Sequence, residues 1–300
     1  MRRKDSLLII VTMIEPQAGH TIAFWQKELE GLLYPRSDTA RLDAQYLLGE
    51  ITSHSLSWVM SHPEYQLGNL QTRLIIDAML KLSAGIPLPY ITGKAFFYNL
   101  EFVITPAVLI PRPETELMVE HALAWCASHA VSTVLDVGTG SGCIAISLAT
   151  HVSNSTITAI DISSDALEIA RQNAELNRVS ERIHFIQGDL AADLTGQYDL
   201  VCANLPYIPT PDLEQLTVVR YEPKVSLDGG ANGLELISLL LAQLPRRMEP
   251  VSCALLEIEY RQGEAVVDLA KSTFPAAYIS LEKDLAGNDR LLVIKNGVNA

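Results

Sequence analysis

The stretch Val134-Leu-Asp-Val-Gly-Thr-Gly-Ser-Gly142 joins a short apolar run to three closely spaced glycines. A helical pattern follows at once, so this order predicts a buried strand, a tight turn and the first turn of a helix. Glycines let the backbone turn sharply and approach a ligand, and the start of a helix presents N–H groups that the helix itself leaves unpaired. We therefore expect a small ligand against this turn. The residues expected to bind it are Gly138, Thr139, Gly140, Ser141 and Gly142.

Strand and helix patterns alternate from Ser132 to the C-terminus. Such alternation predicts an α/β fold with a mainly parallel sheet that is covered by helices on both faces. The last two strands have no helix between them, so we expect them to form an antiparallel edge pair. The expected strands are 133–137, 156–160, 182–186, 198–203, 253–259, 278–281 and 291–295, and the expected helices are 143–150, 165–176, 234–244 and 263–271.

The N-terminal part has a different pattern, which predicts a small helical bundle over residues 20–86. Its last expected helix carries Leu70, Leu74, Met79 and Leu82 at near-helical spacing. Residues 87–112 begin with two helix-breaking prolines and are then rich in aromatic and β-branched residues, which indicates a β-hairpin connector. The α/β domain is expected over residues 113–300.

Residues 1–19 are interpreted as a dispensable or disordered extension. Their basic start and short apolar run imitate a secretory signal, but no small-residue cleavage site follows. No run in the chain reaches the ~18 apolar residues of a membrane span, so we expect no membrane partner.

Composition and charge narrow the function classes. The chain has 300 residues, about two ordinary domains in length, and a formal net charge of −13. Residues 1–112 hold ten basic and ten acidic side chains, whereas residues 113–300 hold twelve and 25. A surface of this sign repels phosphate backbones, so no direct nucleic-acid partner is expected. Four cysteines without a C-x-x-C pair indicate free thiols in a cytoplasmic protein and no metal site.

An acidic residue at the end of the next expected strand suggests which ligand the glycine turn binds. Asp161 stands nineteen residues after Gly142, where doubly wound folds place a carboxylate that binds ribose hydroxyls. The Gly-x-Gly-x-Gly spacing differs from that of dinucleotide sites and favours a nucleoside without pyrophosphate, S-adenosylmethionine above all. A nicotinamide-type cofactor and a purely structural turn are the alternatives. Asp189, after the third strand, is expected to bind the adenine amine; its alternative role is a helix N-cap or a solvated acidic residue in a loop.

The second motif, Asn204-Leu-Pro-Tyr207, directly follows the strand expected at 198–203. An amide nitrogen is a poor nucleophile because its lone pair is delocalised, so a catalyst must hold it in line with the methyl group and withdraw charge from its hydrogens. The Asn204 oxygen and the Leu205 carbonyl are suited to accept those N–H groups, and the Tyr207 ring is suited to stack on the planar amide. Pro206 keeps Leu205 extended. The alternative interpretation is a simple turn.

With these motifs the chain resembles the HemK/PrmC family of protein-(glutamine) methyltransferases. Matching segments run from about Arg41 onward, and Val108-Leu-Ile-Pro-Arg-Pro-Glu-Thr-Glu116 is the most family-specific. The resemblance implies a class I S-adenosylmethionine-dependent methyltransferase domain with a Rossmann-like, mainly parallel seven-stranded sheet. It also implies an N-terminal helical domain that recognises the substrate protein.

The implied reaction moves a methyl group to the side-chain amide nitrogen of the glutamine in the Gly-Gly-Gln loop of class-one peptide-chain release factors. By motif, Asn204, Pro206 and Tyr207 are the catalytic residues, and Leu205 joins them in binding the glutamine. Asn204 is also expected beside the cofactor. We expect the enzyme to be a monomer.

Two residues depart from the family pattern. Leu205 stands where the family usually has proline, and Leu190 stands where an aromatic residue often lies beside the adenine. The sequence Asn-Leu-Pro-Tyr also resembles the motif of ribosomal RNA adenine dimethylases, which leaves an RNA adenine as an alternative target. A catalytically inactive binding protein with this fold is a third interpretation.

Overall fold

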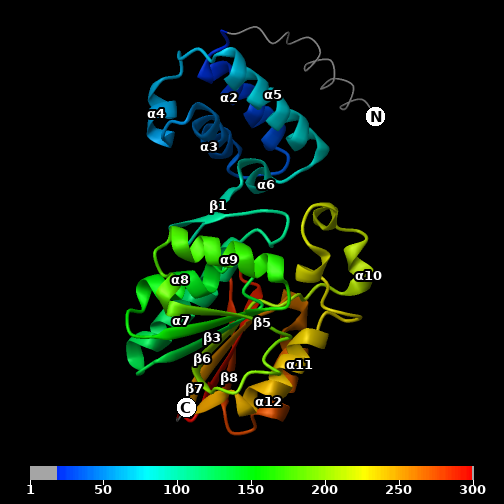
Figure 1. Cartoon of the computed structure of the whole chain (residues 1–300). Coiled ribbons are helices and arrows are strands. Elements are labelled where there is room, and N and C mark those ends of the chain that lie inside the picture. The colour runs from blue at the N-terminus through cyan, green and yellow to red at the C-terminus, as the bar shows by residue number, and fades with distance from the viewer. Residues whose placement is uncertain (1–18, 299–300) are drawn as a thin grey trace. The chain divides into compact units, whose positions relative to one another are not determined.

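The computed structural model describes residues 19–298, which form two units; the first ends at Gly93 and the second begins at Lys94. The expected extension lies outside the described residues, apart from Gly19. The first unit is helical (Figure 1). Its helices are α2 (Ile22–Leu33), α3 (Ala40–Thr52), α4 (Leu56–Ser61), α5 (Asn69–Ala84) and α6 (Leu88–Thr92).

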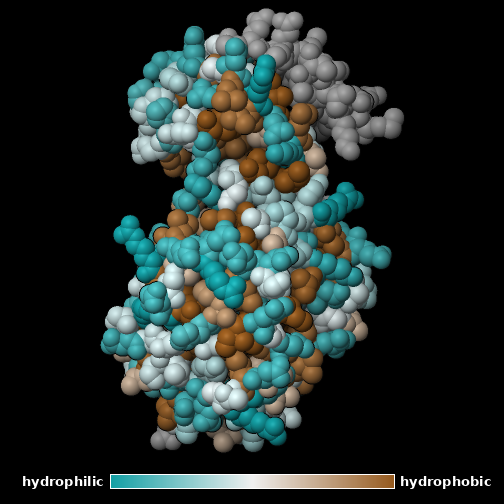
Figure 2. All heavy atoms as spheres, viewed as in Figure 1, coloured by the Kyte–Doolittle hydropathy of each residue, from teal (hydrophilic) through white to brown (hydrophobic). Residues whose placement is uncertain are grey.

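The core of the helical unit contains the fully buried side chains of Trp25, Leu29 and Leu48. From α5 it takes Ile75, Met79 and Leu82, among others. Leu70 and Leu74 were expected on the same face, but they are 71% and 45% exposed. Both lie outside the buried stripe of α5, which begins at Thr72. Figure 2 shows other apolar side chains, in brown, on the visible surface of this unit.

The connector begins later than expected. Residues 88–92 form α6 rather than part of a hairpin. Pro89 does not prevent this helix, because it lies in the first turn, where a missing backbone N–H costs nothing. The hairpin itself consists of β1 (Lys94–Phe97) and β2 (Leu100–Val103). Tyr98 and Asn99 form its turn with positive φ angles of 49° and 60°, as a two-residue hairpin requires.

The second unit is built on a seven-stranded sheet with the order β5-β4-β3-β6-β7-β9-β8. Neighbouring strands from β5 to β7 are parallel, and β9 is antiparallel to both β7 and β8. The expected α/β fold and antiparallel edge pair are therefore confirmed. The strands are β3 (Thr133–Val137), β4 (Thr156–Asp161), β5 (Ile183–Gln187), β6 (Tyr198–Ala203), β7 (Met248–Glu257), β8 (Tyr278–Lys283) and β9 (Asp289–Asn296).

Helices cover both faces of this sheet (Figure 1). The helices of this unit are α7 (Glu116–Ser128), α8 (Cys143–His151), α9 (Ser164–Leu176), α11 (Glu235–Gln243) and α12 (Gly263–Thr273), together with the short α10 (Thr210–Leu213) in a loop. Short 3₁₀ turns lie at Pro113–Thr115, Ser180–Arg182, Thr217–Arg220, Lys224–Ser226, Leu244–Arg246 and Tyr260–Gln262. Among residues 19–298, every helix falls short of the length and apolar character that crossing a membrane requires.

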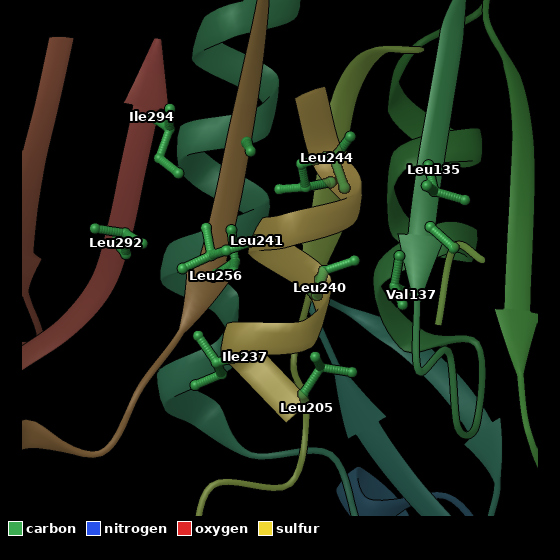
Figure 3. Close-up of a cluster of buried hydrophobic side chains, with 14 of the residues drawn as sticks. Leu135, Val137, Leu205, Ile237, Leu240, Leu241, Leu244, Leu256, Leu292 and Ile294 are labelled. Carbon is green, nitrogen blue, oxygen red and sulfur yellow. The ribbon is translucent and has the colours of Figure 1, made fainter. Parts of the chain in front are cut away.

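One hydrophobic core of this unit lies between α11, α12 and one face of the sheet. Figure 3 shows Ile237, Leu240 and Leu241 of α11 beside strand residues such as Leu256. Leu205 lies in the same cluster, just after the end of β6. Because β3 and β6 are adjacent and parallel, the segments that follow them emerge at the same edge of the sheet.

Candidate active site

The glycine turn connects β3 to α8, and its three glycines all have positive φ angles, 72°, 56° and 82°. They serve different purposes. A Cβ at Gly142 would meet Ile146 Cδ1 at 2.9 Å, and one at Gly138 would meet Leu205 Cδ2 at 3.0 Å, so both positions need close packing. A Cβ at Gly140 would meet no protein atom nearer than 4.0 Å. Gly140 therefore borders open space.

That space is a cavity of about 640 Å³ at the carboxyl edge of the sheet. This volume lies within the ~300–1,000 Å³ of small-molecule sites. The cavity brings together five of the predicted cofactor residues, together with Leu205, Pro206 and Leu190. The five are Gly138, Gly140, Asp161, Asp189 and Asn204.

Three predicted cofactor residues do not line this cavity: Thr139, Ser141 and Gly142. Thr139 and Ser141 are buried. Thr139 Oγ1 instead donates a hydrogen bond of 2.6 Å to Asp136 Oδ2 inside the protein.

Asp161, at the end of β4, both borders the cavity and holds the glycine turn. Its Oδ2 accepts a hydrogen bond from the Gly140 N–H at 2.8 Å, and its Oδ1 accepts one from the Ser163 N–H at 2.9 Å. Burial raises the pKa of this carboxyl, and these backbone donors act in the opposite direction. The side chain thus links the cavity-facing Gly140 to the start of α9.

Asp136, in the middle of the glycine motif, is an unexpected structural residue. It is fully buried, and its Oδ2 also accepts from the Ala145 N–H at 3.2 Å. Burial raises the pKa of this carboxyl to about 7. Its one signal in the sequence is an acidic residue within an otherwise apolar strand.

The Asn204–Tyr207 segment follows β6, as the sequence predicts, and is held by residues that the motif did not reveal. Asn204 Nδ2 donates to Thr115 Oγ1 at 3.0 Å, and Thr115 Oγ1 donates to Glu257 Oε2 at 2.7 Å. Tyr207 OH donates to Glu257 Oε1 at 3.3 Å. Both side chains of the motif are therefore connected to one buried carboxyl group at the end of β7.

The backbone of the same segment lies in a tight cradle. A Cβ at Gly229 would lie 2.7 Å from the Pro206 oxygen, and one at Gly233 would lie 2.2 Å from the Tyr207 oxygen. Gln262 Nε2 donates to that Tyr207 oxygen at 2.9 Å. These contacts allow no side chain at either glycine and fix the path of the motif.

Leu205 is 4% exposed and packs into the core (Figure 3). A Cβ at Gly138 would meet its side chain. The leucine side chain is thus accommodated by the core, and its backbone leads into the cavity edge. Arg112, from the family-specific segment, forms an ion pair of 2.5 Å with Glu222, which is 3% exposed. This pair joins that segment to the loop that continues into Lys224–Ser226 at the cavity.

Among the residues that the structure describes, no three His, Cys, Asp or Glu side chains lie close enough together to bind a metal ion. The four cysteines are free thiols.

Comparison with known proteins identifies the class. Residues 134–219 match a family model described as a methyltransferase domain. The fold is similar to that of the hMettl16 catalytic domain in complex with MAT2A 3'UTR hairpin 6, with a TM-score of 0.53, 14% identity and coverage of 76% of this chain and 82% of that chain. The sheet order, the glycine turn and the match to the methyltransferase domain model define a class I S-adenosylmethionine-dependent methyltransferase.

The family follows from the sequence matches. Residues 25–93 match the model described as the PrmC N-terminal domain. The release factor glutamine methyltransferase of Moorella thermoacetica is 39% identical over 83% of this chain and 89% of its own length. That of Coxiella burnetii is 33% identical over 90% of this chain and 97% of its own length. The chain belongs to the release factor glutamine methyltransferase family.

The residues around the cavity fit the cofactor of this class. The open side of Gly140 leaves room for a ligand against the backbone, and the Asp161 and Asp189 carboxylates suit ribose hydroxyls and an adenine amine. Leu190 supplies an apolar surface beside Asp189 in place of the aromatic ring that often stands there in the family.

Proposed function

We propose that this protein transfers the methyl group of S-adenosylmethionine to the side-chain amide nitrogen of the glutamine in the Gly-Gly-Gln loop of class-one release factors. The observation that carries the proposal is the position of Asn204, Leu205 and Pro206 on the same cavity as Gly140 and Asp161. A target nitrogen held by the first group lies within reach of a cofactor held by the second. The family relationship supplies the protein target.

In this proposal Asn204 Oδ1 and the Leu205 carbonyl oxygen accept the two N–H groups of the substrate amide. Tyr207 stacks on the amide plane, and Pro206 keeps the Leu205 carbonyl in an extended backbone. The bound cofactor supplies an electrophilic methyl group on a sulfonium. Held by these acceptors, the amide nitrogen would face that methyl group as the nucleophile, and its proton would leave to water after the transfer.

Burial of the Tyr207 hydroxyl, together with the nearby Glu257, raises its pKa. The phenol therefore stays protonated at neutral pH and serves as a platform rather than as a base. A strong base is not needed in this scheme, because the nitrogen becomes acidic only once it is methylated.

The helical unit is proposed to recognise the release factor, and the α/β unit to carry out the transfer. We infer that the enzyme acts as a monomer in the cytoplasm, where translation factors work, and binds no nucleic acid directly. The acidic excess after Arg112 supports the last point.

The decisive experiment offers radiolabelled S-adenosylmethionine with three substrates: a purified class-one release factor, its Gln→Ala loop variant, and ribosomal RNA. We expect label only in the unchanged release factor. Label in the RNA alone would establish the adenine alternative, and label in none of them would identify an inactive binding protein.

A further inference from the structure

The hydrogen bonds behind the Asn204–Tyr207 motif fix more than its position. An asparagine amide ends in two groups of nearly equal shape, an oxygen that accepts hydrogen bonds and an NH₂ that donates them. The proposed reaction needs the oxygen toward the substrate. The residue that binds one of these groups determines which group points toward the substrate, and for Asn204 that residue is Thr115.

Counting hydrogens decides the orientation. The Thr115 hydroxyl carries one hydrogen and lies 2.7 Å from Glu257 Oε2 and 3.0 Å from the Asn204 amide. The Thr115 hydroxyl donates this hydrogen to Glu257 Oε2. The Thr115 oxygen is then left to accept from Asn204, and only the NH₂ group of Asn204 is able to donate to it.

We propose that Thr115 and Glu257 are positioning residues that lock the Asn204 amide with its oxygen toward the substrate. The proposal rests on the proposed function, because it assigns these two residues a task in that reaction. Neither residue belongs to the Asn-Leu-Pro-Tyr motif, and both are buried, with exposures of 1% and 2%. They act through Asn204 rather than on the substrate.

The surroundings of Glu257 suit this task. Its second oxygen accepts from Tyr207 OH, so one carboxyl group orients both side chains of the motif. Arg290 of β9 favours its ionised form, whereas burial, which raises the pKa most, and Glu114 favour the neutral form. The buried Cys143 thiol also interacts with it electrostatically. A proton on Glu257 Oε1 would leave the direction of the Thr115 hydroxyl unchanged. Only a proton on Glu257 Oε2, donated to Thr115, would reverse it.

The fold supplies the rigidity. Glu257 is the last residue of β7, which is parallel and adjacent to β6, and Asn204 directly follows β6. Thr115 ends the 3₁₀ turn that leads into α7. The ends of two neighbouring strands and one 3₁₀ turn thus meet in one hydrogen-bonded chain, which holds the Asn204 amide in one direction.

The test compares Thr115→Val, which keeps the shape but removes the hydroxyl, with Thr115→Ser, which keeps it. We expect Thr115→Val to lower kcat by about ten- to hundredfold, since small errors of orientation have effects of this size. The Kd for S-adenosylmethionine should stay within about twofold of the wild-type value, and Thr115→Ser should retain kcat within about threefold. Equal rates for the two variants would overturn the proposal.

A matched pair at Glu257 gives a second comparison. Gln at this position has an oxygen for Thr115 and an NH₂ for Tyr207, so Glu257→Gln should keep much of the rate. Glu257→Met removes both acceptors and frees the Thr115 hydrogen to turn toward Asn204 Oδ1. A Glu257→Met enzyme that is folded by circular dichroism and as fast as Glu257→Gln would contradict the proposal.

Orientation also has a readout that a purely structural role would not change. A flipped Asn204 presents donors, which suit the carboxylate of a release factor with Gln→Glu in its loop. The ratio to measure is the affinity for this Glu form divided by the affinity for the unchanged factor. This ratio should be higher for the Thr115→Val enzyme than for the Thr115→Ser enzyme. We expect this ratio to move by about fivefold or more. An unchanged ratio would show that the amide does not turn.

The last measurement is independent of methyl transfer. Hydrogen exchange of the Asn204 side-chain NH₂, followed by NMR, should be slow in the wild type and in Thr115→Ser, and fast in Thr115→Val. A wild-type enzyme that labels no release factor overturns the proposed function but not this lock. Fast exchange in the wild type overturns the lock but not the proposed function.

Discussion

The Asp161 carboxylate accepts a hydrogen bond of 2.8 Å from the backbone N–H of Gly140, 21 residues earlier in the chain. One side chain at the end of β4 therefore sets the shape of the turn that follows β3. The same carboxylate borders the cavity in which the ribose is proposed to bind. We therefore expect cofactor affinity and the conformation of the turn to be coupled through Asp161.

Replacing Asp161 should weaken cofactor binding more than the loss of one ligand contact would. In Asp161→Asn, one oxygen becomes an NH₂, which faces either the Gly140 N–H or the Ser163 N–H and leaves that donor unpaired. We expect the Kd for S-adenosylmethionine to rise at least tenfold, measured by isothermal titration calorimetry. Asp189→Asn is the control, since Asp189 is exposed and its loss should have a smaller effect. An unchanged Kd for Asp161→Asn would remove Asp161 from the cofactor site.

Removing the Asn204 side chain should separate catalysis from cofactor binding. Asn204→Ala deletes the acceptor proposed for one substrate N–H, and the loss of one such preorganised group lowers kcat by about 10²–10³-fold. The affinity for S-adenosylmethionine should change little, because Asp161 and Gly140 are untouched. Single-turnover methylation with saturating cofactor, together with a binding titration, measures both. Turnover like that of the wild type would exclude Asn204 from the reaction.

The fold could be predicted from the sequence where strands are buried on both faces. Strands β3 and β6 have the expected bounds to the residue, because a buried parallel strand is a nearly continuous apolar run that ends at a turn. Strand β7 begins at Met248, five residues before its expected start. Its first part contains Pro250 and exposed residues, which do not resemble a buried strand.

The site could be predicted only where a local motif carries it. Gly140, Asp161 and Asn204 lie on one cavity as their motifs suggest. Thr115 and Glu257 are 142 positions apart, and their contact depends on how the 3₁₀ turn before α7 packs against the end of β7. Periodicity likewise predicts that α5 exists, but it does not choose which of two apolar stripes is buried, and Leu70 therefore proved exposed.

Leu205 should matter for stability through its side chain and for activity through its backbone. Leu205→Ala leaves a cavity in the core beside α11 and should lower the free energy of unfolding by about 2–4 kcal/mol, measured by chemical denaturation. Leu205→Pro restores the residue usual in the family and keeps the carbonyl oxygen, so kcat should stay within about fivefold. A Leu205→Ala enzyme that is as stable as the wild type would contradict the placement of this side chain in the core.

Asp136 should make stability depend on pH in a direction opposite to that of a salt-bridged carboxylate. Its pKa is raised from 3.8 to about 7 in the folded protein, mainly because the carboxyl group is buried. Between these values the folded state holds a proton that the unfolded state has released. The contribution of Asp136 to stability is therefore fully present below about pH 4, and it is lost as the pH rises through about 7.

Asp136→Asn tests this dependence with little change of shape. Within residues 19–298 Asp136 Oδ1 has no hydrogen-bond partner, so an NH₂ group in its place breaks no bond, while the acceptor for Thr139 and Ala145 remains. Relative to the wild type, the variant should gain about 2 kcal/mol in the free energy of unfolding between pH 5 and pH 8. Urea denaturation of both proteins without cofactor, at both pH values, measures this gain. Any fixed cost of the substitution cancels in the comparison, so a difference that does not change with pH would show that Asp136 titrates normally.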